Sequence, residues 1–255
     1  MSKVLKYILP DILRNKIVLL FTGALLLITI SIINISETPE KIILSLLNIE
    51  LIVLPLVCLV FATIYFYNAA EFMEVLAAQP LKRRNILFPI LAGLTISLVL
   101  AFMIGTGIPL LLYYPSVASV LFVVSGIMLI AIFTAFATVA AVFTRDKAHG
   151  VGLSLLIWFY FTLIFDGIIL FLMFRFSEYP IEKGITAIVF LNPVDLVRIM
   201  VLLQTDNAAL MGYTGAVFRN LFGSGMGMTM VAAALLSWLL LSVTAALRKF
   251  RRKDL

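Results

Sequence analysis

Two carboxylic acids, Glu50 and Asp166, occur inside long apolar stretches of this 255-residue chain. An ionised side chain at the middle of a membrane costs about 2.5 to 3.5 kcal/mol on insertion scales. Asp166 lies about eight residues before the outer end of its stretch, a depth of about 12 Å, and Glu50 lies at a similar depth. A shared polar site on a gate or substrate path is therefore conceivable. The alternative is two protonated or hydrogen-bonded groups that fix helix packing.

Three thioethers alternate in "GMGMTM" as Met226, Met228 and Met230. Thioethers are soft ligands that suit Cu(I), so this triplet is a weak candidate metal site. Residues two apart on a helix point in different directions, so the sulfur atoms converge only if Gly225 and Gly227 keep the backbone irregular. Ordinary packing of methionine side chains is the alternative.

Most known catalytic arrangements are excluded by composition. His149 is the only histidine, so neither an HExxH zinc site nor a histidine triad elsewhere can form. Asp166 is the only aspartate in the apolar stretches, which excludes an aspartate dyad. No GxxxxGK[ST] motif is present, so the chain has no P-loop for nucleotide. We expect no catalytic residues and no bound cofactor.

The elements that carry these residues are membrane helices. With 63% hydrophobic and 13% charged residues, the chain is far more apolar than a soluble protein. Six stretches reach the roughly 20 residues that a spanning helix needs: about 17–35, 46–67, 86–111, 118–143, 151–174 and 226–247. The fold class is therefore an all-α membrane protein. The single cysteine, Cys58, cannot form an intramolecular disulfide.

The basic residues indicate the orientation. If both termini are inside, 14 of the 19 Lys and Arg residues lie in inner segments, as the positive-inside rule requires. The net positive charge is thus explained by topology, and we expect membrane lipids but no nucleic acid as partners. Residues 1–16 have apolar residues at helical spacing and predict an amphipathic helix on the inner membrane face. A cleaved signal peptide is the alternative, but the apolar run is too long and "SIINISETPE" offers no cleavage site.

A long segment, 175–225, is expected outside between the fifth and sixth spans. Within it, "LNPVDLVRIMVLLQ" (191–204) begins like a helix, because Asn192 can cap it, Pro193 fits its first position and Asp195 favours its positive end. The stretch is too short to span, so we predict a re-entrant or interfacial helix. The following "TDNAALMGYTGAVFRNLFGSGMGM" is typical of a turn-rich segment.

The first inner loop, 69–85, is unusually polar for its surroundings. Residues 69–78 contain good helix formers, with Phe72, Val75 and Leu76 expected around one side and Glu71 and Glu74 elsewhere. Pro80 ends this helix, and Lys82, Arg83 and Arg84 anchor the next span. The cations alone would make a topogenic loop. The two glutamates on a short helix exceed that need and favour a docking element for a cytoplasmic partner.

The order of these parts resembles the ABC-2 type permeases of ABC transporters. Their first cytoplasmic loop typically has a glutamate, a leucine-rich helix and a "P-(L/V)-(S/K)-R" turn before "IL", which Glu71 or Glu74, Leu76, Pro80, Leu81, Arg83 and Ile86 match. The resemblance implies a single transmembrane domain over 1–255, with 1–16 as an elbow helix and 69–85 as a coupling loop. It also implies a separate ATPase subunit that binds ATP and Mg, a permease homodimer, and location in a bacterial inner membrane.

A narrower resemblance lies in the outer segment. "FLNPVDLVRI", "DNAALMGYTGAVFRNLFG" and "GLSLLIWFYFTLIFDGIIL" are similar to NosY-type permeases, which serve maturation of the copper centres of nitrous oxide reductase. That resemblance implies a periplasmic β-helical partner and a copper-chaperone lipoprotein. On this hypothesis Asn192, Asp195 and Arg198 shape the outer docking surface.

Three functions are compared on this basis. The leading hypothesis is an ABC permease subunit, with a generic exporter of unknown cargo as its coarser form. An ion-coupled secondary transporter would use Glu50 and Asp166, but the inverted repeats typical of that class are not evident. A passive membrane scaffold would tolerate disruption of 71–85.

Overall fold

The computed structural model describes residues 2–36, 38–78, 83–176, 182–202 and 225–250, and all elements in these ranges are helical. Within these ranges six helices are long and apolar enough to cross a membrane, which agrees with the predicted number of spans. They are Lys16–Ile35, Pro39–Asn68, Arg83–Tyr113, Val117–Phe143, Lys147–Arg175 and Gly227–Phe250. Most extend a few residues beyond the predicted apolar stretches.

The N-terminal half contains the first three spans. Helix α1 (Ser2–Leu13) precedes α2 (Lys16–Ile35), whose N-cap Asn15 accepts a hydrogen bond from the backbone N–H of Ile17. Helix α3 (Pro39–Asn68) leads into the short α4 (Ala70–Ala77). The third span consists of α5 (Arg83–Phe102), a π-helical turn η1 (Met103–Gly107) and α6 (Ile108–Tyr113).

The C-terminal half repeats this use of a π-helical turn. Helix α7 (Val117–Phe143) is the fourth span. The fifth consists of α8 (Lys147–Phe159), the π-helical turn η2 (Tyr160–Ile164) and α9 (Phe165–Arg175). Two short helices follow, α10 (Glu182–Val189) and α11 (Pro193–Leu202), and α13 (Gly225–Phe250) is the last span.

Helix α7 forms the centre of the bundle, because it packs against α3, α5, α8, α11 and α13. Small residues on α7, among them Ala137 and Ala141, are fully buried, and such residues let membrane helices approach closely. Within its apolar window 61% of α7 is buried, against 11% of the fifth span. The fifth span is therefore left to contact lipid or another chain.

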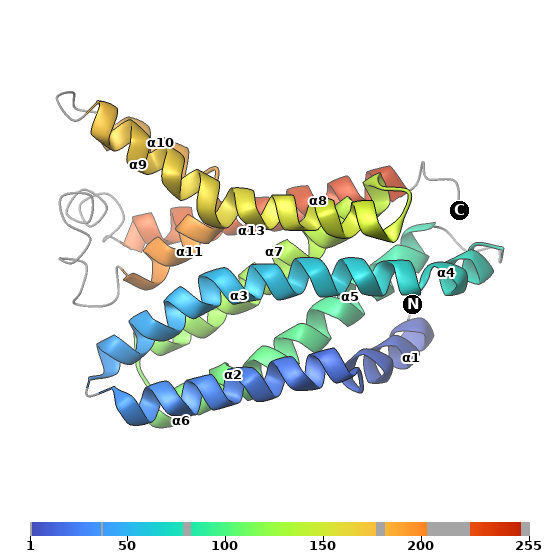
Figure 1. The fold of residues 1–255 in the computed structure, drawn as a ribbon, viewed down its shortest axis with the longest axis horizontal. Coiled ribbons are helices and arrows are strands. Elements are labelled where there is room, and N and C mark those ends of the chain that lie inside the picture. The colour runs from blue at the N-terminus through green and yellow to red at the C-terminus, as the bar shows by residue number, and fades with distance from the viewer. Residues whose placement is uncertain (1, 37, 79–82, 177–181, 203–224, 251–255) are drawn as a thin grey trace.

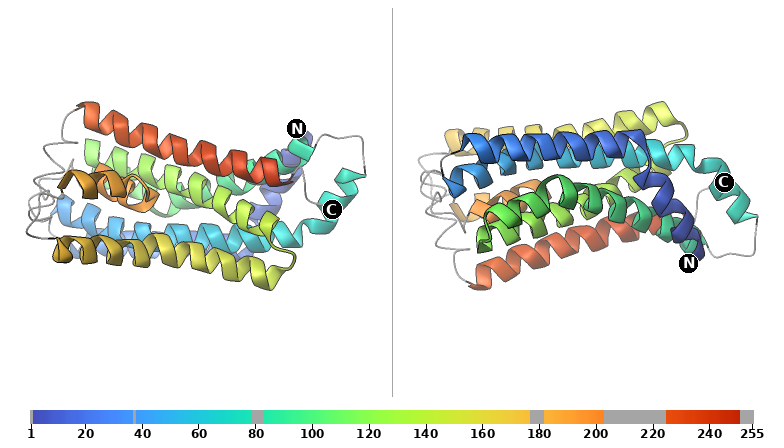
Figure 2. Two further views of the ribbon diagram at one scale, coloured as in Figure 1. Left: turned by 90° about the horizontal axis from the view of Figure 1, so that it is seen from above. Right: turned by 90° about the horizontal axis from the view of Figure 1, so that it is seen from below.

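The two ends of the bundle differ. Helices α1 and α4, the beginning of α5 and the end of α13 lie at one end, and the turn between α2 and α3 and the helices α10 and α11 lie toward the other (Figure 1). The perpendicular views show the same arrangement (Figure 2). The predicted helix at the N-terminus is present, and its buried Ile8 and Ile12 belong to the core where α1 packs on α5. Its expected place on the inner membrane surface stays a prediction.

Candidate functional site

A cluster of charged side chains joins the fifth span to α11. Arg198 on α11 makes a two-point contact with Asp166 on α9, with N–O distances of 3.2 Å and 2.9 Å. The same guanidinium donates to Asp195 one turn earlier on α11, also at 2.9 Å. The Arg198 and Asp166 side chains are about one third exposed, and that of Asp195 is 6% exposed. The planar guanidinium suits such two-point recognition of a carboxylate.

Asn192 ties this cluster to a carbonyl group that η2 leaves free. In a regular α-helix the N–H of Phe165 would bond to the carbonyl oxygen of Phe161, but here it bonds to that of Tyr160. The amide nitrogen of Asn192 donates to the free Phe161 oxygen at 2.9 Å. The same nitrogen donates to Asp195, also at 2.9 Å. The π-helical turn thus provides an attachment point for α11.

The start of α11 follows the prediction. The side-chain oxygen of Asn192 accepts the backbone N–H of Val194 at 2.9 Å, so Asn192 is the N-cap. Pro193 takes the first helical position and Asp195 lies in the first turn. The helix packs against α3, α7 and α13, with nearly all its side chains buried. Whether this helix is re-entrant or interfacial stays a prediction.

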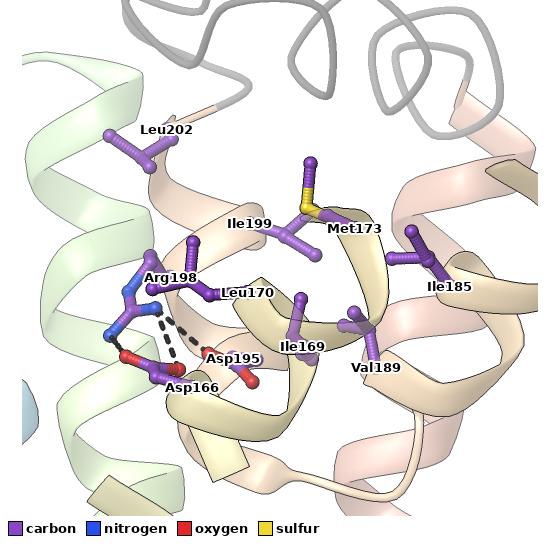
Figure 3. A pocket seen from close by; sticks show the side chains of 10 residues that line it. All are labelled: Asp166, Ile169, Leu170, Met173, Ile185, Val189, Asp195, Arg198, Ile199 and Leu202. Carbon is purple, nitrogen blue, oxygen red and sulfur yellow. Dashed lines mark hydrogen bonds and ion pairs between the residues drawn. The ribbon is translucent and has the colours of Figure 1, made fainter. Parts of the chain in front are cut away.

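The charged cluster lies at the edge of a cavity of about 350 Å³ (Figure 3). The other walls are apolar side chains of α9, α10 and α11, among them Leu170, Met173 and Ile199. Two carboxylates face one guanidinium, so the cluster carries a surplus of negative charge when both are ionised. The arrangement fixes α11 to α9 and borders a space that accepts an apolar group.

Asp166 and Glu50 do not share a site, contrary to the first alternative from sequence. Glu50 lies on α3 against α7 and η1, beside a small cavity bordered by Thr29, Thr106 and Phe122. Neither of its carboxyl oxygens has a hydrogen-bond partner among the described residues. Similar depth in two spans does not place two residues together, because depth leaves the direction of each side chain around its helix undefined.

The predicted docking residues divide into two kinds. Asn192 and Asp195 are buried, so a direct contact with another protein would fall to Arg198. Sequence reasoning missed the pairing of Arg198 with Asp166. A signal was present, since Arg198 lies three residues after Asp195 on a helix expected near the membrane. Docking of a periplasmic protein at this surface stays a prediction.

The helix predicted in the first loop is present as α4, and its buried side is formed by Met73 and Leu76. Met73 and Leu76, one turn apart, are the buried residues, whereas Phe72 and Val75 are 43% and 63% exposed. Glu71 and Glu74 are exposed as well. Phe72, Val75 and Leu76 lie around one side of the helix by their spacing, but of these three only Leu76 is buried. The apolar pair at spacing three packs inward because α4 contacts α3 and α5.

Of the predicted coupling residues that follow α4, the structure describes Arg83. Pro80 and Lys82 lie outside the described residues. Arg83 is half-buried, and its guanidinium donates to the backbone oxygen of Phe250 at 3.3 Å, near the end of α13. A cation near the C-terminus of a helix is stabilising. Arg83 thus connects the third and sixth spans, and its predicted role in ATPase coupling is untested.

The methionine triplet does not converge where it can be described. Helix α13 begins at Gly225, so Met228 and Met230 lie two positions apart on a regular helix. Met228 packs on the core, and Met230 is 51% exposed. The side chain of Met226 lies outside the described residues. Within the described ranges no three His, Cys, Asp or Glu side chains are grouped to hold a metal ion.

Comparison with known proteins gives two similar chains, both permeases. No family model matches the chain. A probable ABC transporter permease protein NosY of Stutzerimonas stutzeri is 28% identical over 232 residues, which cover 82% of this chain and 79% of the relative. The protein of the same name from Pseudomonas aeruginosa PAO1 is 27% identical over 180 residues, 66% of each chain. Together with the six apolar helices, these similarities support a multi-pass ABC transporter permease subunit, resembling NosY.

Proposed function

We propose that this chain is the membrane subunit of an ATP-driven transporter and that α4 is where its cytoplasmic ATPase binds. The observation that carries the proposal is the exposed surface of α4. Met73 and Leu76 anchor the helix on the bundle, and Phe72 and Val75 point away from it, flanked by two carboxylates. Exposed apolar side chains rimmed by polar ones are typical of protein interaction sites.

A path for transmission follows from the packing. Helix α4 follows α3 with only Ala69 between them, so a displacement of α4 acts directly on the end of α3. Helix α3 packs against α7, α8 and α11. The Nε1 atom of Trp158 on α8 donates to the backbone oxygen of Ile52 on α3 at 3.0 Å. ATP binding at the inner end would therefore reach α11 and its charged cluster through packed helices.

The finer proposal is a role in maturation of the copper centres of nitrous oxide reductase. It is supported by the two NosY-named relatives and by the outer motifs that resemble NosY-type permeases. In this proposal the chain forms a homodimer in the inner membrane, with both termini cytoplasmic. ATP and Mg bind to the ATPase subunit, and the outer segment contacts a periplasmic β-helical protein and a copper-chaperone lipoprotein.

Glu50 and Asp166, which the secondary-transporter alternative would use, have separate surroundings. The two NosY-named relatives favour the permease.

Charge reversal on α4 tests the ATPase contact. We expect Glu71→Lys with Glu74→Lys to abolish copurification of the ATPase and to reduce stimulated ATP hydrolysis at least tenfold, because two repelling charges enter the interface. The matched control is Glu40→Lys, the same kind of reversal near the start of α3 at the opposite end of the bundle. Thermal unfolding in detergent should be unchanged. Normal copurification and hydrolysis in the double variant would refute the proposal.

The proposed role in maturation of the copper centres needs a separate test in the native host. We expect deletion of this chain to lower the copper content of purified nitrous oxide reductase, and the wild-type chain to restore it. If the reductase had its full complement of copper after the deletion, the maturation role would be refuted. The proposal that the ATPase binds α4 would not be affected.

A further inference from the structure

Glu50 is a buried carboxylic acid without a partner. Its side chain is 4% exposed on α3, and neither oxygen makes a hydrogen bond within the part of the chain that the structure describes. Buried polar groups in proteins are nearly always hydrogen-bonded, so an exception calls for an unseen partner or a function.

Helix α7 leaves room for this carboxyl at one position. A Cβ atom added to Gly126 would lie 2.6 Å from Oε1 of Glu50 and 2.5 Å from Cζ of Phe102. No residue larger than glycine fits there without displacing the carboxyl or the ring. The absence of a side chain at Gly126 therefore makes the space that Glu50 occupies.

A small, partly open space adjoins the carboxyl. Its volume is about 10 Å³, close to the least that one water molecule needs. Two hydroxyl groups border it, those of Thr29 on α2 and Thr106 in η1, and Thr29 donates a hydrogen bond to Thr106 at 3.1 Å. Because Thr106 accepts that bond, its own hydroxyl hydrogen remains available. One water molecule would thus find a donor in Thr106 and a second polar contact in Glu50.

Among the described residues that border this space, none carries a charge that would balance an ionised Glu50. The described residues that border this space are apolar apart from Glu50 and the two threonines, and they come from α2, α3, α5, η1 and α7. An ionised carboxylate among them would carry a large desolvation cost. A carboxylic acid that keeps its proton and forms a hydrogen bond with water avoids that cost.

We propose that Glu50 is a proton-binding site inside the membrane, in which the protonated carboxyl shares one water molecule with Thr29 and Thr106. The proton is held while the helices around the cavity stay packed. An arrangement that admits more water to this space would allow Glu50 to ionise. Protonation therefore favours the packed arrangement, and a change of helix packing is linked to proton release.

Infrared spectroscopy of the detergent-solubilised full chain tests this directly. The carbonyl stretch of a protonated carboxylic acid is separated from the amide bands and from ionised carboxylates. Biosynthetic labelling with ¹³C-carboxyl glutamate distinguishes glutamate from aspartate without any substitution. We expect a protonated-glutamate band that persists at neutral pH, where exposed glutamates are ionised. The absence of such a band in the wild-type chain would overturn the proposal.

Variants assign the band and its water partner. Glu50→Gln should remove the band, and the matched control Asp166→Asn should leave it in place. Thr29→Val combined with Thr106→Val should move the band to higher wavenumber, because the carboxyl group loses its hydrogen-bonded water. A band retained in Glu50→Gln would overturn the assignment. An unshifted band in the threonine double variant would overturn the shared water site.

Discussion

Asp166 and Glu50 are the two carboxylic acids in the predicted apolar stretches, and their surroundings differ in kind. Asp166 is one third exposed and receives two hydrogen bonds from a guanidinium. Glu50 is buried, with no cation beside it and a glycine opposite. The Asp166 carboxylate is paired with a guanidinium, whereas Glu50, in our proposal, holds a proton. The groups that the neighbouring helices place beside each carboxyl, and not its depth in the membrane, determine this difference.

The difference in surroundings also predicts different effects of substitution at the two carboxyls. The Asp166 cluster connects two elements, α9 and α11, so its removal should loosen the end of the bundle where they lie. Glu50 connects nothing by hydrogen bonds in the described residues, so changes there should act through packing.

The largest effect is expected from Arg198→Leu. This change leaves two carboxylates without their shared cation, and we expect it to lower the free energy of unfolding by about 3 kcal/mol, measured by thermal unfolding in detergent. Arg198→Lys is the control, because it keeps the charge but loses the two-point contact, and its loss should be smaller. Equal stability of wild type and Arg198→Leu would show that the cluster is not a structural connection.

A smaller effect is expected from Gly126→Ala, which tests packing around Glu50. The added methyl group meets the carboxyl and Phe102, and we expect a loss of roughly 2 kcal/mol in unfolding free energy. Gly167→Ala, next to Asp166, is the matched control because a Cβ there meets nothing within 4 Å. That control should be neutral or stabilise by up to about 1 kcal/mol. Similar effects at both glycines would contradict the tight packing inferred at Glu50.

The smallest effect is expected from Asp166→Asn. The two-point charged contact is lost, but Asp195 keeps its bond to Arg198 and like-charge repulsion is relieved. We expect a loss of about 1 kcal/mol in unfolding free energy. A double-mutant cycle with Arg198→Leu measures the coupling between the two side chains. Zero coupling would show that Arg198 acts through Asp195 alone.

The sequence predicted those features that depend on composition and short-range pattern. The six spans follow from apolar length, and the start of α11 follows from the order Asn192, Pro193, Asp195. The presence of α4 follows from its helix formers. Its buried face was not predicted, because the choice of Met73 over Phe72 depends on how α4 leans on α3 and α5.

Long-range features were missed for a related reason. The pairing of Asp166 with Arg198 joins residues 32 positions apart and needs the fold to be known. The separation of Glu50 from Asp166 likewise depends on which way each helix is turned. The two π-helical turns carry no obvious signal in hydropathy, so the direction of side chains beyond them could not be derived.

The π-helical turn at Tyr160–Ile164 has a consequence for rotational phase along the fifth span. Such a turn accommodates one residue more than an α-helix does, and one residue corresponds to about 100° around the axis. Asp166 faces Arg198 only with this offset included. Removal of a single residue within the turn would shorten the span very little, yet it would swing the carboxyl away from α11 and deprive Asn192 of the Phe161 carbonyl. The direction in which the side chains of α9 point is therefore set by an insertion in the middle of the span.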